Sequence, residues 1–186
     1  MATISDAISQ TPTLLVNTLL RGSEGQFGAP RAGGKTHQGV DIVATVSSMD
    51  KSTYQVRATA SGIIAYARNN GSPASPGYGF TVVIDHQNGF YTLYAHLAPN
   101  ASNGVVILGQ QVNAGDLLGF LADLANGEKS SGNARAVAPF DRIQLHFECF
   151  ETNAGLSSGG QLQPIKANCA LDDPTNQLVA LGYKSF

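Results

Sequence analysis

The sequence has little charge and no excess of positive charge. Only 13% of its 186 residues are Asp, Glu, Lys or Arg, and the formal net charge is −2. Proteins that bind nucleic acid usually carry a basic excess, because Lys and Arg neutralise the phosphates. We therefore expect no nucleic-acid partner.

Long apolar runs and a targeting signal are also missing. No stretch approaches the ~18 apolar residues that a membrane-spanning helix needs, so we expect no membrane span. The N-terminal MATISDAISQTPTLLVNTLL has no basic segment, and Asn17 and Thr18 interrupt its apolar part, unlike a secretory signal peptide. Three interpretations stay open: a signal already removed, another export route, or a protein that remains inside the cell.

Cysteine is scarce, with Cys149 and Cys169 as the only two. They do not form a Cys-x-x-Cys pair, which argues against a cysteine-based zinc site. Two buried thiols and one disulfide both stay open, and the disulfide would require export of the protein.

Glycine and turn residues are abundant instead, and from about residue 21 they separate short apolar runs. Asn88-Gly89 lies between two β-rich runs and is a strong hairpin signal. Further turns are expected at Ser61-Gly62, Gly109 and Gly115. We therefore predict a mainly β fold, an antiparallel sheet with little helix. The strands are expected within 56–68, 80–97, 105–121 and 142–150.

The length suits one domain with a core of its own. We interpret residues 1–20 as an N-terminal arm, 21–166 as the domain itself, and 167–186 as a C-terminal tail packed on the core. The small, polar stretch 125–141 is interpreted as a long surface loop, a kind of segment that often carries function.

The first motif with chemical potential is His37-Gln-Gly-Val-Asp41. Imidazole nitrogen and carboxylate oxygen both suit zinc. Gly39 would let the backbone bend, so that both side chains reach one ion. The alternative is a polar pair in a surface loop.

The second motif is Gln144-Leu-His146-Phe-Glu148, inside a predicted strand. Because side chains alternate along a strand, the three named residues share one face, and the residues between them take the apolar face. Alone, this pattern also fits a sheet with one solvated face. Cys149 points away from His146, so we expect neither cysteine to contact a metal.

The third motif is Tyr94-Ala-His96, whose outer residues would share one face of a strand. A single histidine there is commonly a hydrogen-bonded structural residue. His86, just before the hairpin turn, is assigned no chemistry.

In combination, the three motifs predict a zinc site. His37, Asp41 and His146 make three protein ligands, the number that catalytic zinc sites use while they leave one position open for water. His96 is then available to move protons.

The three motifs resemble those of the lysostaphin/LytM-type (β-lytic) zinc metallopeptidases, which have the duplicated-hybrid-motif fold. That family carries His-x-Gly-x-Asp, Tyr-Ala-His-Leu and His-x-His-Phe-Glu in this order. The chain has HQGVD (37–41), YAHL (94–97) and QLHFE (144–148). The resemblance extends over about residues 21–166 and implies a LytM-like domain with long loops.

By this resemblance, Zn2+ is held by His37, Asp41 and His146, and His96 is one of two catalytic histidines. The second catalytic histidine of the family is the first His of His-x-His, where this chain has Gln144. Glutamine cannot act as a base or carry charge, but it can hydrogen-bond a water or a developing oxyanion.

The resemblance implies a zinc metalloendopeptidase that hydrolyses peptide bonds in peptidoglycan cross-links or stem peptides, in the periplasm or cell wall. The alternative is a peptidoglycan-binding or regulatory module, with weak or no activity because of Gln144. A toxin or virion-associated lysin would share the chemistry, and a toxin would add an immunity protein or a delivery machinery as partners.

Overall fold

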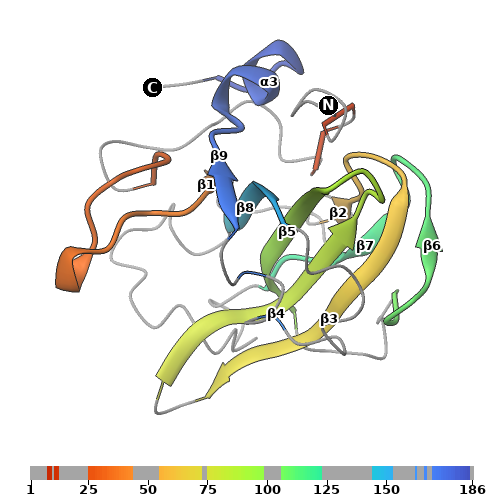
Figure 1. Ribbon diagram of the computed structural model, residues 1–186, viewed down its shortest axis with the longest axis horizontal. Helices are drawn as coiled ribbons and strands as arrows, with labels where there is room; N and C mark the ends of the chain where they lie inside the picture. Colours follow the sequence, from red (N-terminus) through yellow and green to blue (C-terminus); the bar gives the residue numbers. More distant parts are fainter. Residues whose placement is uncertain are drawn as a thin grey trace.

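An antiparallel sheet of seven strands forms the centre of the part of the molecule that the computed structural model describes (Figure 1). The strand order is β1-β8-β5-β4-β3-β6, with β9 also paired to β8, and β2 and β7 form a separate two-stranded sheet. The predicted mainly β, antiparallel fold is confirmed. The structure describes residues 8–9, 11–12, 25–43, 55–72, 75–98, 106–122, 144–152, 162, 166 and 169–184.

One long hairpin dominates the sheet and extends beyond the other strands in Figure 1. The hairpin consists of β3 (Gly62–Ser72) and β4 (Ser75–Asp85). The other strands are β1 (Val40–Val43), β2 (Gln55–Arg57), β5 (Phe90–Leu97), β6 (Gln111–Val112), β7 (Leu117–Phe120), β8 (Gln144–Glu151) and β9 (Ala170–Asp172). The described helices are a 3-10 turn, η1 (Ala32–Gly34), and α3 (Thr175–Ala180).

The turns predicted at Asn88-Gly89, Gly109 and Gly115 are confirmed. β4 and β5 are joined through Asn88-Gly89, with Gly89 at φ 90°. Gly109 and Gly115, on either side of β6, have φ values of 82° and 85°, a conformation that glycine adopts without steric penalty. Between β2 and β3 the chain bends at Thr59 and Ala60 rather than at Ser61-Gly62, because Gly62 already belongs to β3. β2 and β3 pair with different strands, β7 and β4.

Apolar side chains pack on both faces of the large sheet. One cluster includes Ile42, Tyr94 and Phe147, and the cluster on the other face includes Leu93 and Phe150. The alternative interpretation, in which the polar face of β8 contacts solvent, is therefore wrong for His146 and Glu148. The exposed fractions of His146 and Glu148 are only 4% and 0%.

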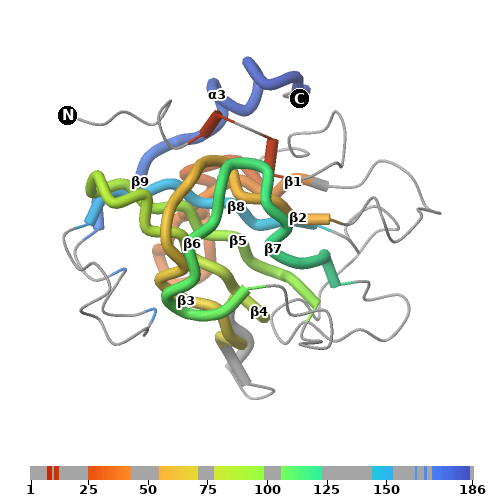
Figure 2. Tube along the Cα trace, turned by 90° about the vertical axis from the view of Figure 1, so that its right-hand side faces the viewer, coloured from red at the N-terminus to blue at the C-terminus, as the bar shows by residue number. Residues whose placement is uncertain are grey.

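The C-terminal segment lies against the same core. β9 pairs with β8, and α3 lies beyond it at the top of both ribbon and tube views (Figures 1 and 2). Leu178 and Tyr183 join the first apolar cluster, as Ile8 does from the N-terminal segment. The division into 1–20, 21–166 and 167–186 stays a prediction, and the loop expected at 125–141 lies outside the described residues.

Both cysteines are free thiols, so the structure contains no bridge between Cys149 and Cys169. Cys149 is fully buried in the first apolar cluster, and burial raises the pKa of its thiol. Among the described helices, none has the length and apolar character that crossing a bilayer requires.

Gly39 lies at a bend, as expected, but the bend is not the reason for the glycine. Its backbone is not in the left-handed region, so the bend itself does not require glycine. Instead, β8 passes so close that a Cβ at this position would collide with the carbonyl oxygen of Phe147 and lie 2.7 Å from Cγ of Glu148. Only glycine allows this approach of the segment before β1 to β8.

We therefore expect Gly39→Ala to push β1 away from β8. Overpacking of a close contact typically costs about 1–3 kcal/mol, and urea unfolding of the metal-free protein would measure it. Gly28→Ala is the control for backbone strain without overpacking. Nothing lies within 4 Å of a Cβ at this position, and only the φ of 77° disfavours alanine there. An unchanged midpoint for Gly39→Ala would contradict the close approach.

Candidate metal centre

The three predicted ligands come together because β1 and β8 pair. Asp41, in β1, lies directly opposite His146 in β8, and His37 lies just before β1. On its other side β8 pairs with β5, where Ala95 is opposite His146. Residues more than one hundred positions apart in sequence therefore meet on one face of the sheet.

The ligand atoms of these residues form a compact triangle. Nδ1 of His146 lies 2.8 Å from Oδ1 of Asp41 and 2.9 Å from Nε2 of His37. The third edge, from His37 Nε2 to Asp41 Oδ1, measures 3.1 Å. Zinc ligands at about 2.0–2.1 Å in a tetrahedral arrangement are about 3.3 Å apart, so small adjustments would admit an ion.

In both imidazole rings, the nitrogen that faces away from the triangle has a hydrogen-bond partner of its own. This contact determines which nitrogen faces the centre of the triangle. Nδ1 of His37 is 3.0 Å from the carbonyl oxygen of Gln26, and Nε2 of His146 is 2.8 Å from Oε1 of Glu148. Both partners can only accept, so in the neutral rings these nitrogens carry the protons. The lone pairs of His37 Nε2 and His146 Nδ1 then point at the Asp41 carboxylate, an arrangement that favours a positive charge between them, either a proton on His146 or a metal ion.

The charges of the cluster support this conclusion. Burial opposes ionisation of Asp41, but its hydrogen bonds with His146 and His37 outweigh burial and lower the pKa of the carboxyl. Burial would lower the pKa of His146, but the hydrogen bonds to Asp41 and Glu148 raise it to about 9. The site thus favours positive charge at its centre. The donor set fits zinc, whose binding would displace a proton.

His96 reaches the site through an unusual backbone conformation. Regular alternation would place it on the face of Tyr94, whose ring packs against Phe147. Its φ is 64°, in the left-handed region, and its ring centroid lies 5.9 Å from that of His146. The expectation that Tyr94 and His96 share a face is therefore wrong, because the strained backbone turns His96 toward the ligands.

The electrostatic surroundings keep His96 neutral. Burial, followed by the proximity of His146, lowers the pKa of its imidazole to about 4, although Asp41 and the backbone of Tyr78 oppose the shift. Its Nδ1 atom is buried and has no hydrogen-bond partner in the described part of the chain. A neutral ring with an unused nitrogen beside the three ligands can accept a hydrogen bond or a proton at Nδ1.

Gln144 begins β8 and lies opposite Val43, the last residue of β1. It is two residues from His146 on the same face of the strand, and it is partly exposed. His86 takes no part in the centre, since its ring nitrogens contact the Ser61 carbonyl and the Thr92 hydroxyl.

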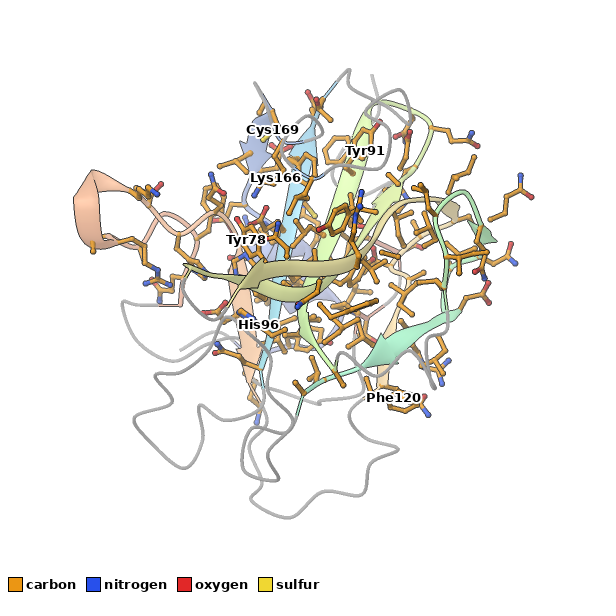
Figure 3. All side chains as sticks on the ribbon, turned by 90° about the horizontal axis from the view of Figure 1, so that it is seen from below. Tyr78, Tyr91, His96, Phe120, Lys166 and Cys169 are labelled. Carbon is orange, nitrogen blue, oxygen red and sulfur yellow. The ribbon has the colours of Figure 1, made fainter. Side chains whose placement is uncertain are left out.

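Two side chains around His146, those of Tyr78 and Lys166, are not predicted by the sequence motifs. Tyr78 stacks on the His146 ring with centroids 5.3 Å apart, and it contacts Gln38 and Lys166. Figure 3 shows Lys166, Tyr78 and His96 in succession along the sheet. Alternation in the strand correctly predicted that Glu148 shares the face of His146, but no local pattern marks Tyr78 or Lys166.

Solved structures share this fold at low sequence identity. The NMR structure of lysostaphin has a TM-score of 0.57 and 21% identity, over 96% of this chain and 57% of that chain. The catalytic domain of the antimicrobial peptidase lysostaphin from Staphylococcus simulans gives 0.53 and 19%, over 88% and 92%. LytM from Ruminococcus gnavus ATCC 29149 gives 0.58 and 18%, over 97% and 65%.

The chain thus spans little more than half of the whole lysostaphin molecule, but nearly all of that protein's catalytic domain. No curated protein matches the sequence. The model of peptidase family M23 matches residues 35–157, which include His37, Asp41, His96, Gln144 and His146, and the chain belongs to this family.

Proposed function

We propose that the protein is a zinc metalloendopeptidase that hydrolyses peptide bonds in bacterial peptidoglycan, in the periplasm or cell wall. The observation that carries the proposal is the triangle of His37 Nε2, Asp41 Oδ1 and His146 Nδ1, in which the outer nitrogen of each ring lies beside an oxygen acceptor. Membership of family M23 and the likeness to an antimicrobial peptidase support the choice of substrate.

Zinc held by His37, Asp41 and His146 would act as a Lewis acid on the scissile carbonyl and lower the pKa of water. His96 is the proton carrier of the chain: neutral and unpartnered at Nδ1, it accepts a proton during attack and returns it to the leaving amine. Gln144 donates a hydrogen bond to developing negative charge from its amide.

The proposal is tested on purified sacculi. We expect the zinc-loaded protein to release soluble peptides with new amino termini, seen by mass analysis. A chelator should stop the release, and added zinc should restore it. The competing function, a peptidoglycan-binding module, is favoured by one observation, glutamine at position 144. Binding to every sacculus type without release, with or without chelator, would establish that function instead.

Removal of one ligand should remove the metal. We expect the wild type to hold one zinc per chain on elemental analysis and His146→Ala to lose most of it, because two ligands hold zinc poorly. His86→Ala is the matched control, since His86 bonds to Ser61 and Thr92 rather than to the ligands. Stoichiometric zinc in His146→Ala would show that the ligands are wrongly assigned.

Substitutions of His96 should separate activity from stability. His96→Ala and His96→Gly should both lose about 10²–10⁴-fold in turnover and keep their zinc. In an ordinary strand alanine is more stable than glycine by roughly 0.5–1 kcal/mol. At φ 64° the order should reverse by about 1 kcal/mol, since alanine is strained there. Urea unfolding of the metal-free variants gives the order, and a more stable alanine variant would refute the strained conformation.

Substitutions of Gln144 should have smaller effects. Gln144→Ala is expected to reduce turnover roughly tenfold, the equivalent of one neutral hydrogen bond. Gln144→His should keep or raise turnover, because it restores the second histidine of the family and the position is partly exposed. The three rates are measured on one sacculus preparation. A loss for Gln144→Ala as large as for His96→Ala would contradict the division of roles.

A further inference from the structure

Lys166 is a buried lysine with all of its donors used. Its Nζ lies 2.5 Å from Oε2 of Glu148, 2.8 Å from Oε1 of Gln38 and 2.9 Å from the hydroxyl of Tyr78. The side chain is 8% exposed, and that of Glu148 is 0% exposed. An ammonium group has three protons, so these three oxygens satisfy it completely.

Each oxygen belongs to a residue that contacts or adjoins the metal centre. Glu148 accepts the Nε2 proton of His146 at 2.8 Å through its other oxygen. The Tyr78 ring stacks on the His146 ring with an interplanar angle of 28°. Gln38 follows the ligand His37 directly in the chain.

The partners of Lys166 are also tied to one another. The Tyr78 hydroxyl donates to Oε1 of Gln38 at 2.9 Å, and Lys166 Nζ lies 4.9 Å from the centre of the Tyr78 ring. Lys166 therefore connects a side chain of β8, one of β4 and the segment that carries His37. Figure 3 shows it beside Tyr78.

We infer that Lys166 is a positioning residue for the metal centre. It holds the Glu148 carboxylate, which keeps the proton of His146 on Nε2 and the Nδ1 lone pair directed at Asp41. This inference rests on the proposed function, because the ion that His146 is positioned to bind is zinc. Outer partners of metal-bound histidines typically change metal affinity about 10–100-fold when they are removed.

A simpler role is that Lys166 only balances the charge of buried Glu148 and so supports folding. The two roles differ in what happens to zinc. A purely structural lysine changes the unfolding midpoint of the metal-free protein but leaves the zinc affinity of the folded protein unchanged. A positioning lysine changes the affinity, and it does so only while Glu148 is present.

The experiment is a double-mutant cycle on zinc affinity, measured by competition with a chromophoric chelator. We expect Lys166→Met and Glu148→Gln each to weaken zinc binding about 10–100-fold. The double variant should be no weaker than the weaker-binding single variant, because Lys166 acts through Glu148. Lys35→Met is the matched control, since Lys35 is exposed and close to His37 in sequence; its affinity should equal that of the wild type.

The visible spectrum of the cobalt-loaded protein provides a second readout, because it reports the ligand field at the ion. It should change in Lys166→Met and stay as in the wild type in Lys35→Met. If Lys166→Met does not fold, Lys166→Gln replaces it, because an amide still donates to Glu148 and leaves no bare carboxylate. This variant should bind zinc at least about fivefold more weakly than the wild type, since the shorter amide cannot reach all three oxygens.

Folded Lys166 variants with wild-type zinc affinity and an unchanged cobalt spectrum would overturn the inference and leave the proposed function intact. A double variant at least tenfold weaker than either single variant would also overturn it, because Lys166 would then act independently of Glu148. A wild type that binds no zinc would instead refute the proposed function, and this inference with it.

Discussion

The pairing of β1 with β8 is the constraint on which the candidate site depends. It places Asp41 opposite His146 and brings His37 beside both, although neither segment holds more than two ligands. A shift of the register by one residue would turn Asp41 into the apolar cluster that contains Phe147, because side chains alternate between faces. The close approach at Gly39 belongs to the same constraint, since a side chain there would separate the strands that assemble the ligands.

A row of ionisable side chains on a buried sheet face is unfavourable unless every charge has a partner. Here the charges alternate, from Asp41 through His146 and Glu148 to Lys166, with contacts of 2.5–2.8 Å. In the metal-free protein, His146 has its pKa raised to about 9 and supplies the positive charge between the two carboxylates. A metal at the centre takes over that charge. The same row therefore explains how the site is tolerated in the fold and why it selects a cation.

Local sequence patterns predicted much of the fold and part of the candidate site. Asn88-Gly89 predicted the hairpin, and the alternation in β8 put His146 and Glu148 on one face. Structural features that depend on contacts between distant segments could not be predicted from local sequence patterns. The left-handed conformation of His96 reverses the face that alternation assigns, although the combination of motifs and the family resemblance both pointed to His96 as a proton carrier. Gly39 is required by a strand more than one hundred residues away, and Lys166 meets Glu148 only in the folded protein.

The two directions along β8 from His146 differ in a way that bears on substrate access. Toward the C-terminal end of the strand, Glu148 is fully buried and held by Lys166, and Tyr78 lies over the imidazole. Toward the start of the strand, Gln144 is partly exposed. Among the described residues, the Glu148 end of the centre is therefore filled by side chains bonded to one another, and Gln144 is the more exposed of the two positions. Gln144, where this chain departs from the motif that it resembles, thus lies at the end of the centre away from the Glu148–Lys166 pair, where a substitution leaves the buried support of the ligands intact.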